Sequence, residues 1–244
     1  MKRAADNHII ESLQKQILAM QGNRVALEPH LKLGLGALEN AFPGKSFPRA
    51  AIHELISYSS QQAACTSGFM AVVLGKLIQQ QGICIWVSTK PRRAVFPPAL
   101  KTFGLAPNRI LFVDTARPKQ TLWALEEALK CDAVTAVVGE LNELSFDESR
   151  RFQLAVEQSR VTGFIHRFRP KLTNAVACVS RWKISSLPSF SPDGLPGIGF
   201  PRWNIRLEKV KNGIPGEWQV QWSTGKGLEY IQSQENAAAE RQTG

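Results

Sequence analysis

The sequence predicts an α/β fold, a mostly parallel sheet flanked by helices, with a helical segment before it and an antiparallel hairpin after it. From residue 52 onward, near-continuous apolar runs of strand length alternate with helix-length segments, which is typical of parallel strands covered on both faces. Over residues 203–207 and again over 218–222 the apolar and polar residues alternate, as in antiparallel strands with one buried face. A chain of 244 residues suits one such domain with attachments.

The N-terminal segment, residues 1–30, is predicted to be a helical arm outside the core. Ile10, Leu13 and Ile17 recur at helical spacing and would form one apolar stripe. The stripe leaves two roles open. It could pack on its own domain, or it could dock in a groove of a partner or of a neighbouring subunit.

The core is expected over residues 31–230, and the polar end of the chain, residues 231–244, is expected to be disordered. Its lead-in, residues 32–50, is rich in Gly and Pro and predicts a loop around one short helix. Strands are predicted at AIHEL (51–55), ICIWVST (83–89), RILFVD (109–114), AVTAVVGEL (133–141), TGFIHRF (162–168) and AVACVSRWKI (175–184). Helices are predicted at SGFMAVVLGKLIQQQ (67–81), PALKTFGL (98–105), QTLWALEEALK (120–130) and FDESRRFQLAVEQSR (146–160).

Two local signals fix details of these elements. Ser145 and Glu148 have the spacing of a capping box and open the last helix. The final pair of strands, 202–210 and 217–223, flanks a turn at Asn212-Gly213. The tryptophans of this hairpin are expected to form a packed apolar face rather than a base-stacking platform: Trp203, Trp218 and Trp222.

The segment from the first strand into the first long helix has the strand–loop–helix order of a phosphate-binding loop, but it lacks the residues that bind phosphate. Residues 57–68 contain hydroxyls and one glycine, but no lysine and no G-x-x-x-x-G-K-[ST]. The residues of this degenerate loop are Ser57, Ser59, Ser60, Thr66, Ser67 and Gly68. Glu140 could stand in for a metal-shell acid, but alone it has nothing to act on. We therefore expect no bound nucleotide, no other cofactor and no catalysis.

Other glycine, acid and cysteine patterns carry no competing chemistry. Gly44-Lys45-Ser46 precedes the first strand, and Glu39 stands where a P-loop needs its first glycine, so the triplet predicts a turn. His53-Glu54 is interpreted as a polar pair at a strand end. The four dispersed cysteines show no metal-ligand spacing and fit a reducing cytoplasm. The N-terminus does not resemble a signal peptide, and no run is long enough to span a membrane.

Positive charge points to the kind of partner. The net charge is +10 and the pI about 9.7, which favours nucleic acid or an acidic protein. Arg92 and Arg93 follow one predicted strand, and Arg167, Arg169 and Lys171 follow another. Because parallel strands share a carboxyl edge, these cations are expected to form one patch that binds DNA or an acidic partner weakly. The alternative is a set of unrelated solvated faces.

Several sequence blocks, and their order along the chain, resemble the ImuA family. The blocks are GLGALENAFPGKSFPRAAIHEL, FPPALKTFGLAPNRILFV, LWALEEAL, AVVGEL, RRFQLAVEQSRVTGFI, RWKI and WNIRLEKVKNGIPGEWQVQW. The resemblance implies a RecA-like fold in a damage-induced cassette for mutagenic translesion DNA synthesis. It implies adapter work with ImuB, a polymerase-like protein, and with RecA, in a complex with an error-prone replicative-type polymerase. The missing lysine argues against ATP-driven filament formation.

Two further readings stay open. GFIHRFRP followed by RWKI also resembles SulA, a RecA-like cell-division inhibitor, which would imply binding to the tubulin-like division protein. The SulA family is shorter and does not account for the N-terminal segment and the long lead-in. A recombinase ATPase comes third, and it would bind magnesium-ATP tightly.

Overall fold

The computed structural model describes residues 32–78, 82–89, 95–190 and 199–231. They form one nine-stranded sheet in the order β3-β2-β4-β5-β1-β6-β7-β8-β9. The pairs from β3 to β6 are all parallel, and the pairs from β6 to β9 are antiparallel. The predicted N-terminal arm (1–30) and the predicted C-terminal tail from residue 232 onward lie outside the described residues.

The parallel half follows the predicted alternation of strand and helix closely. Its strands are β1 (Ile52–Ser57), β2 (Cys84–Thr89), β3 (Ile110–Thr115), β4 (Ala136–Leu141) and β5 (Thr162–Phe168). Its helices are α2 (Ser60–Ile78), α3 (Pro97–Leu100), α4 (Pro118–Lys130) and α5 (Phe146–Ser159). Short 3-10 turns complete it: η2 (Gly36–Ala41), η3 (Pro43–Lys45), η4 (Lys101–Phe103) and η5 (Pro107–Arg109). The predicted capping box of α5 is confirmed: Ser145 and Glu148 bond to each other's backbone N–H groups.

The antiparallel half is larger than the predicted hairpin. It consists of β6 (Ser180–Phe190), β7 (Phe200–Val210), β8 (Gly216–Ser223) and β9 (Gly227–Tyr230). β6 therefore has a double role, because it pairs in parallel with β1 and antiparallel with β7. The predicted turn between β7 and β8 is confirmed, and Asn212 takes the positive φ that it requires, 57°.

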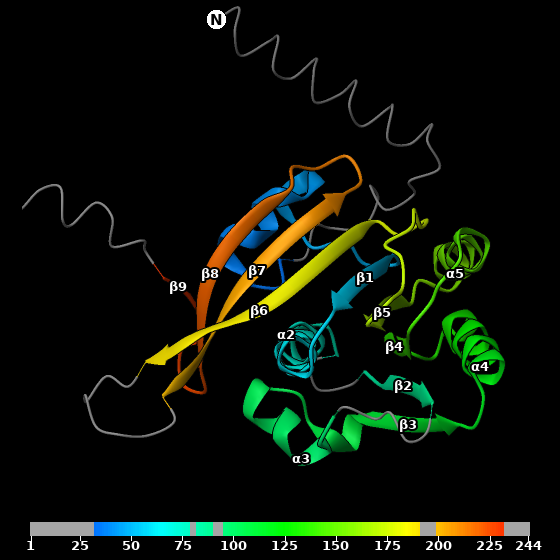
Figure 1. The fold of residues 1–244 in the computed structure, drawn as a ribbon, viewed down its shortest axis with the longest axis horizontal. Coiled ribbons are helices and arrows are strands. Elements are labelled where there is room, and N and C mark those ends of the chain that lie inside the picture. The colour runs from blue at the N-terminus through cyan, green and yellow to red at the C-terminus, as the bar shows by residue number, and fades with distance from the viewer. Residues whose placement is uncertain (1–31, 79–81, 90–94, 191–198, 232–244) are drawn as a thin grey trace, which may run out of the picture.

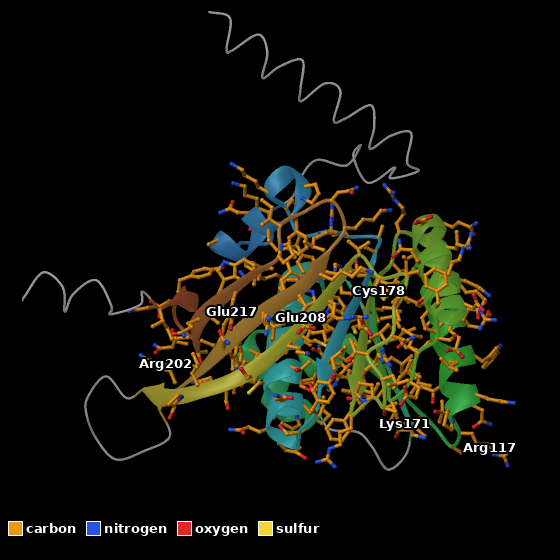
Figure 2. All side chains as sticks on the ribbon, turned by 45° about the horizontal axis from the view of Figure 1, so that its top comes forward. Arg117, Lys171, Cys178, Arg202, Glu208 and Glu217 are labelled. Atoms are coloured by element: carbon orange, nitrogen blue, oxygen red, sulfur yellow. The ribbon has the colours of Figure 1, made fainter. Side chains whose placement is uncertain are left out.

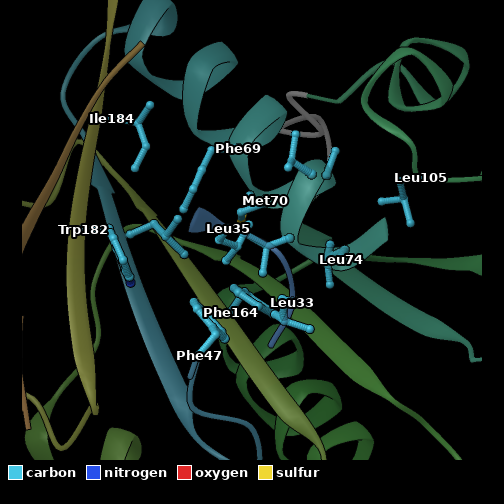
Figure 3. Packing of buried hydrophobic residues seen from close by; sticks show 14 of the residues in the cluster. Leu33, Leu35, Phe47, Phe69, Met70, Leu74, Leu105, Phe164, Trp182 and Ile184 are labelled. Carbon is cyan, nitrogen blue, oxygen red and sulfur yellow. The ribbon is translucent and has the colours of Figure 1, made fainter. Parts of the chain in front are cut away.

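Helices cover the two faces of the parallel strands, as Figure 1 shows, with α4 and α5 on one side and α2 on the other. α2 is apolar all round through Phe69–Leu74 because it is enclosed between the sheet, the lead-in and the antiparallel strands. Figure 3 shows this packing, with Phe69 of α2 beside Trp182 of β6. A Cβ at Gly68 would lie 2.9 Å from the Trp203 ring, so this glycine permits the close approach of β7.

The tryptophans of the hairpin belong to this core, as predicted. Trp203 is buried against Phe103, while Trp218 and Trp222 pack on the edge of the same cluster. Glu39 also has a structural role. Its buried carboxylate accepts hydrogen bonds from the backbone N–H groups of Leu33 and Leu35 and so fixes the lead-in. Among the described helices none combines the length and the apolar character needed to cross a membrane.

Candidate interface at the carboxyl edge of the sheet

The connection from β1 to α2 is far shorter than predicted. Only Tyr58 and Ser59 lie between the end of the strand and the first residue of the helix. Ser59 Oγ accepts from the backbone N–H of Gln62 at 3.1 Å, and Gln62 Oε1 accepts from the backbone N–H of Tyr58 at 2.8 Å. The first bond starts the helix directly after the strand, because it satisfies a first-turn donor that a helix N-terminus otherwise leaves free, and the second ties the residue before the cap to the same turn. The expected loop over residues 57–68 is therefore wrong.

The hydroxyls assigned to that loop are mostly inside the protein. Thr66, Ser67 and Gly68 are buried within α2, whereas Ser60 is exposed at its first position. Ser57 Oγ lies 2.9 Å from Thr66 Oγ1 and 3.0 Å from His166 Nε2, and all three side chains are buried. Burial lowers the pKa of His166 to about 4, so its ring is neutral at pH 7. Ser57, Thr66 and His166 thus bond to one another inside the protein.

Glu140 lies where the sequence placed it, at the carboxyl end of β4. Its Oε1 accepts a hydrogen bond from the indole N–H of Trp86 on neighbouring β2 at 3.1 Å. Among the described residues there is no group of three His, Cys, Asp or Glu side chains that could hold a metal ion. The acid thus helps to orient a buried tryptophan.

Arg167 corrects the predicted basic patch. Its side chain is fully buried, and its Nη1 donates to Glu54 Oε1 at 2.8 Å. Arg181 approaches the other oxygen of the same carboxylate, with Nε 2.5 Å from Oε2. Glu54 therefore sits between two guanidinium groups in mid-strand, and the interpretation of His53-Glu54 as a strand-end pair is also wrong. Arg167 faces this carboxylate because β5 pairs in parallel with β1 and the register puts the two side chains on the same face of the sheet, Glu54 opposite Ile165 and Ile56 opposite Arg167.

Arg169 and Lys171 are the members of the patch that the structure places on the surface. Figure 2 shows Lys171 at the same edge of the molecule as Arg117. Arg169 stacks on the Phe168 ring at 5.0 Å, and its Nε donates to Tyr58 O at 3.1 Å. The exposed Tyr58 ring also has the ammonium group of Lys183 5.4 Å from its centroid.

The other predicted interface residues lie outside the described part of the chain. They are Arg92 and Arg93 of the patch, and Ile10, Leu13 and Ile17 of the N-terminal stripe.

A second buried polar chain, centred on His53, was missed by the sequence analysis. His53 Nε2 lies 2.8 Å from Pro48 O, which can only accept, so Nε2 carries the proton. Nδ1 then accepts from Ser180 Oγ at 2.6 Å, and Ser180 Oγ accepts from Trp182 Nε1 at 2.7 Å. Burial lowers the pKa of His53 to about 4. The chain ties the lead-in to β1 and β6.

Two signals could have identified these features. Ser59-Ser60-Gln61-Gln62 matches the S-x-x-Q form of a capping box and marks a helix start. A charged residue in the middle of an apolar strand, as at Glu54, requires an opposite charge nearby. The identity of that partner was not predictable, because Arg167 is 113 positions away.

Comparison with known structures defines the fold. The RadB recombinase matches with a TM-score of 0.56 at 14% identity, over 83% of this chain and all of the RadB chain, so the fold is RecA-like. Protein ImuA of Caulobacter vibrioides is 32% identical over 206 residues, which covers 79% of this chain and 83% of the relative. The chain belongs to the ImuA family.

A related family matches part of the chain. The model of the cell division inhibitor SulA matches residues 51–163. SulA of Yersinia pestis is 29% identical over 110 residues, covering 45% of this chain and 64% of the relative. The SulA likeness thus spans β1 to the start of β5, whereas the ImuA likeness covers most of the chain.

Proposed function

We propose that this protein is a non-catalytic adapter of a damage-induced, mutagenic translesion DNA synthesis complex. In this role it binds ImuB and RecA and, through the complex, reaches an error-prone replicative-type polymerase. Membership of the ImuA family supports the assignment. The observation that carries the absence of catalysis is the two-residue connection between β1 and α2.

The physical argument concerns the atoms that would hold phosphate. A P-loop cradles phosphates with free backbone N–H groups of a glycine-rich loop and with a lysine. Here the N–H groups of Tyr58 and Gln62 are already bonded to side chains. No lysine occurs from residue 57 to residue 68, and the one glycine there, Gly68, is buried in the helix. This arrangement favours a scaffold over an ATPase.

The nucleotide prediction is tested with purified protein. We expect no ATP hydrolysis above background and no change of melting temperature at millimolar magnesium-ATP, because only a ligand that prefers the folded state raises stability. The assays are phosphate release and thermal denaturation with and without nucleotide. A clear rise of the melting temperature with ATP would contradict the proposal, whereas a rise with any polyanion would indicate non-specific binding.

The partner assignment is tested by binding to purified ImuB and purified RecA, each immobilised separately. We expect the full-length protein to be retained by ImuB and by RecA, and not by an unrelated acidic protein of similar size. Retention by neither partner would reject the adapter function.

A second candidate function is a SulA-like inhibitor of cell division. The match of the SulA model to residues 51–163 favours it. Binding to the immobilised tubulin-like division protein, measured alongside binding to ImuB and to RecA, distinguishes the two functions. Retention there, together with no binding to ImuB, would favour the inhibitor.

A further inference from the structure

A short segment after β5 exposes an apolar side chain to solvent, and several hydrogen bonds from side chains hold the backbone around it. We call residues 169–174 the Leu172 loop. The Leu172 side chain is 74% exposed, and the cations Arg169 and Lys171 lie exposed beside it. A single exposed leucine is ordinary. What sets this one apart is the set of groups that hold the chain around it.

The buried Arg167, the half-buried Arg181 and the exposed Glu143 fix the backbone on both sides of Leu172. Arg167 Nη2 donates to Leu172 O at 3.0 Å, and the Lys171 N–H donates to Glu143 Oε1 at 2.8 Å. Arg181 Nη2 donates to Asn174 O at 2.6 Å. Both arginines are held by the buried carboxylate of Glu54. Burying charges costs free energy, so a buried network of this kind is weak evidence for stability, whereas its hydrogen bonds directly fix the carbonyl groups of Leu172 and Asn174.

The entry to the loop is strained as well. Arg169 has a φ of 50°, a left-handed conformation that residues other than glycine rarely adopt. It is held there by the bond from its N–H to Ser57 O at 2.7 Å and by its side-chain bond to Tyr58 O. Such strain persists only where the surroundings over-determine the conformation, and it concentrates at functional sites.

We propose that the Leu172 loop is a preorganised docking knob for a protein partner whose matching site is an apolar pocket with an acidic rim. The proposal deepens the adapter function and rests on it. A pre-fixed loop loses little entropy on binding, and hot spots combine a central apolar anchor with a polar rim. Arg169 and Lys171 complement an acidic rim. A leucine offers no flat π-face for a nucleic-acid base, so a protein fits better than DNA.

The test compares Leu172→Ala with Ile214→Ala, a matched control at the turn between β7 and β8 where the isoleucine is also 74% exposed. Affinities for purified ImuB and RecA are measured by biolayer interferometry, with melting temperatures as the folding check. We expect Leu172→Ala to weaken binding to one partner by about tenfold or more, because hot-spot anchors exceed this cost. Ile214→Ala should bind as wild type, and both variants should keep the wild-type melting temperature.

A second variant tests the constraint itself. Glu143→Ala removes the acceptor of the Lys171 N–H and also the carboxylate 3.4 Å from Arg167 Nη2, but keeps the Leu172 side chain, whereas Glu143→Gln keeps an oxygen acceptor there. We expect Glu143→Ala to speed hydrogen exchange at Lys171 and to weaken the same partner's binding severalfold, and Glu143→Gln to restore both towards wild type.

Each result decides one question. If wild type binds ImuB or RecA and Leu172→Ala binds equally well, the knob is wrong and the adapter function stands. If Leu172→Ala impairs only binding to a labelled single-stranded oligonucleotide, the loop serves nucleic acid and the knob is overturned. If wild type binds neither protein, the adapter function fails and the knob falls with it.

Discussion

Arg167 was predicted to be a surface cation of a basic patch, but its side chain is buried. In the sequence it stands in RFRPK and resembles a surface cation, but in the structure it is enclosed with Glu54. Among the described residues, removing it would leave Arg181 as the ion-pair partner of that carboxylate. We expect Arg167→Ala to lower the free energy of unfolding by about 3–5 kcal/mol, the usual cost of breaking a buried pair.

Urea denaturation followed by circular dichroism measures this loss. The control is Arg169→Ala, two positions away and exposed, which removes one side-chain hydrogen bond to Tyr58 O and should lower the free energy of unfolding by about 1 kcal/mol at most. Similar losses in the two variants would show that burial is not what distinguishes these arginines.

The two buried histidines predict a pH dependence of stability. The pKa values of His53 and His166 are lowered from 6.5 to about 4, so the unfolded chain binds more protons than the folded one between these values. Their contribution is therefore complete above pH 6.5 and is lost as the pH falls towards 4. It amounts to about 3 kcal/mol for each histidine. Urea midpoints from pH 7 to pH 4.5 should fall, and they should fall less in His166→Gln; an equal fall in this variant would contradict the role of His166.

At the scale of elements, the hydrogen bond that caps α2 at Ser59 is predicted to contribute to stability. Ser59→Ala removes the acceptor for the Gln62 N–H and should destabilise the protein by about 1 kcal/mol. Ser60→Ala is the matched control, since Ser60 is exposed at the first helical position. Urea denaturation compares the variants, and an equal loss in Ser60→Ala would mean that Ser59 is not the cap.

The elements also show how far sequence reasoning reaches. The parallel strands and their helices could be predicted because their apolar runs are long and differ clearly in period. The start of α2 was placed at Ser67 rather than Ser60, because small polar residues resemble a loop. The later part of β6 and the whole of β9 were missed, since SSLPSF and GLEY carry too little apolar alternation. Side-chain partners across the sheet could not be predicted, because register decides them.

At the scale of the whole molecule, the net charge of +10 predicts weak binding to single-stranded DNA. We expect its affinity to fall by roughly one power of salt concentration for each phosphate contacted, with little sequence preference. Arg169→Glu/Lys171→Glu should weaken binding, as should Arg92→Glu/Arg93→Glu; Arg167 is left unchanged because it is buried. Fluorescence anisotropy with a labelled oligonucleotide at two salt concentrations measures these effects. Binding by wild type that neither double variant impairs would show that these cations are a solvated face.

The strand order also governs how the chain can assemble as it is made. β1 is the first strand of the described sheet to leave the ribosome, yet both its neighbours, β5 and β6, are synthesised more than a hundred residues later. At about 5–20 residues per second, β1 waits for several seconds without a sheet partner. During that time its unpaired backbone groups and the apolar side chains that are buried in the folded protein are exposed and can associate with other chains. Nascent copies of this protein are therefore expected to need chaperone protection over that interval, since long-range parallel pairing is slow and prone to aggregation.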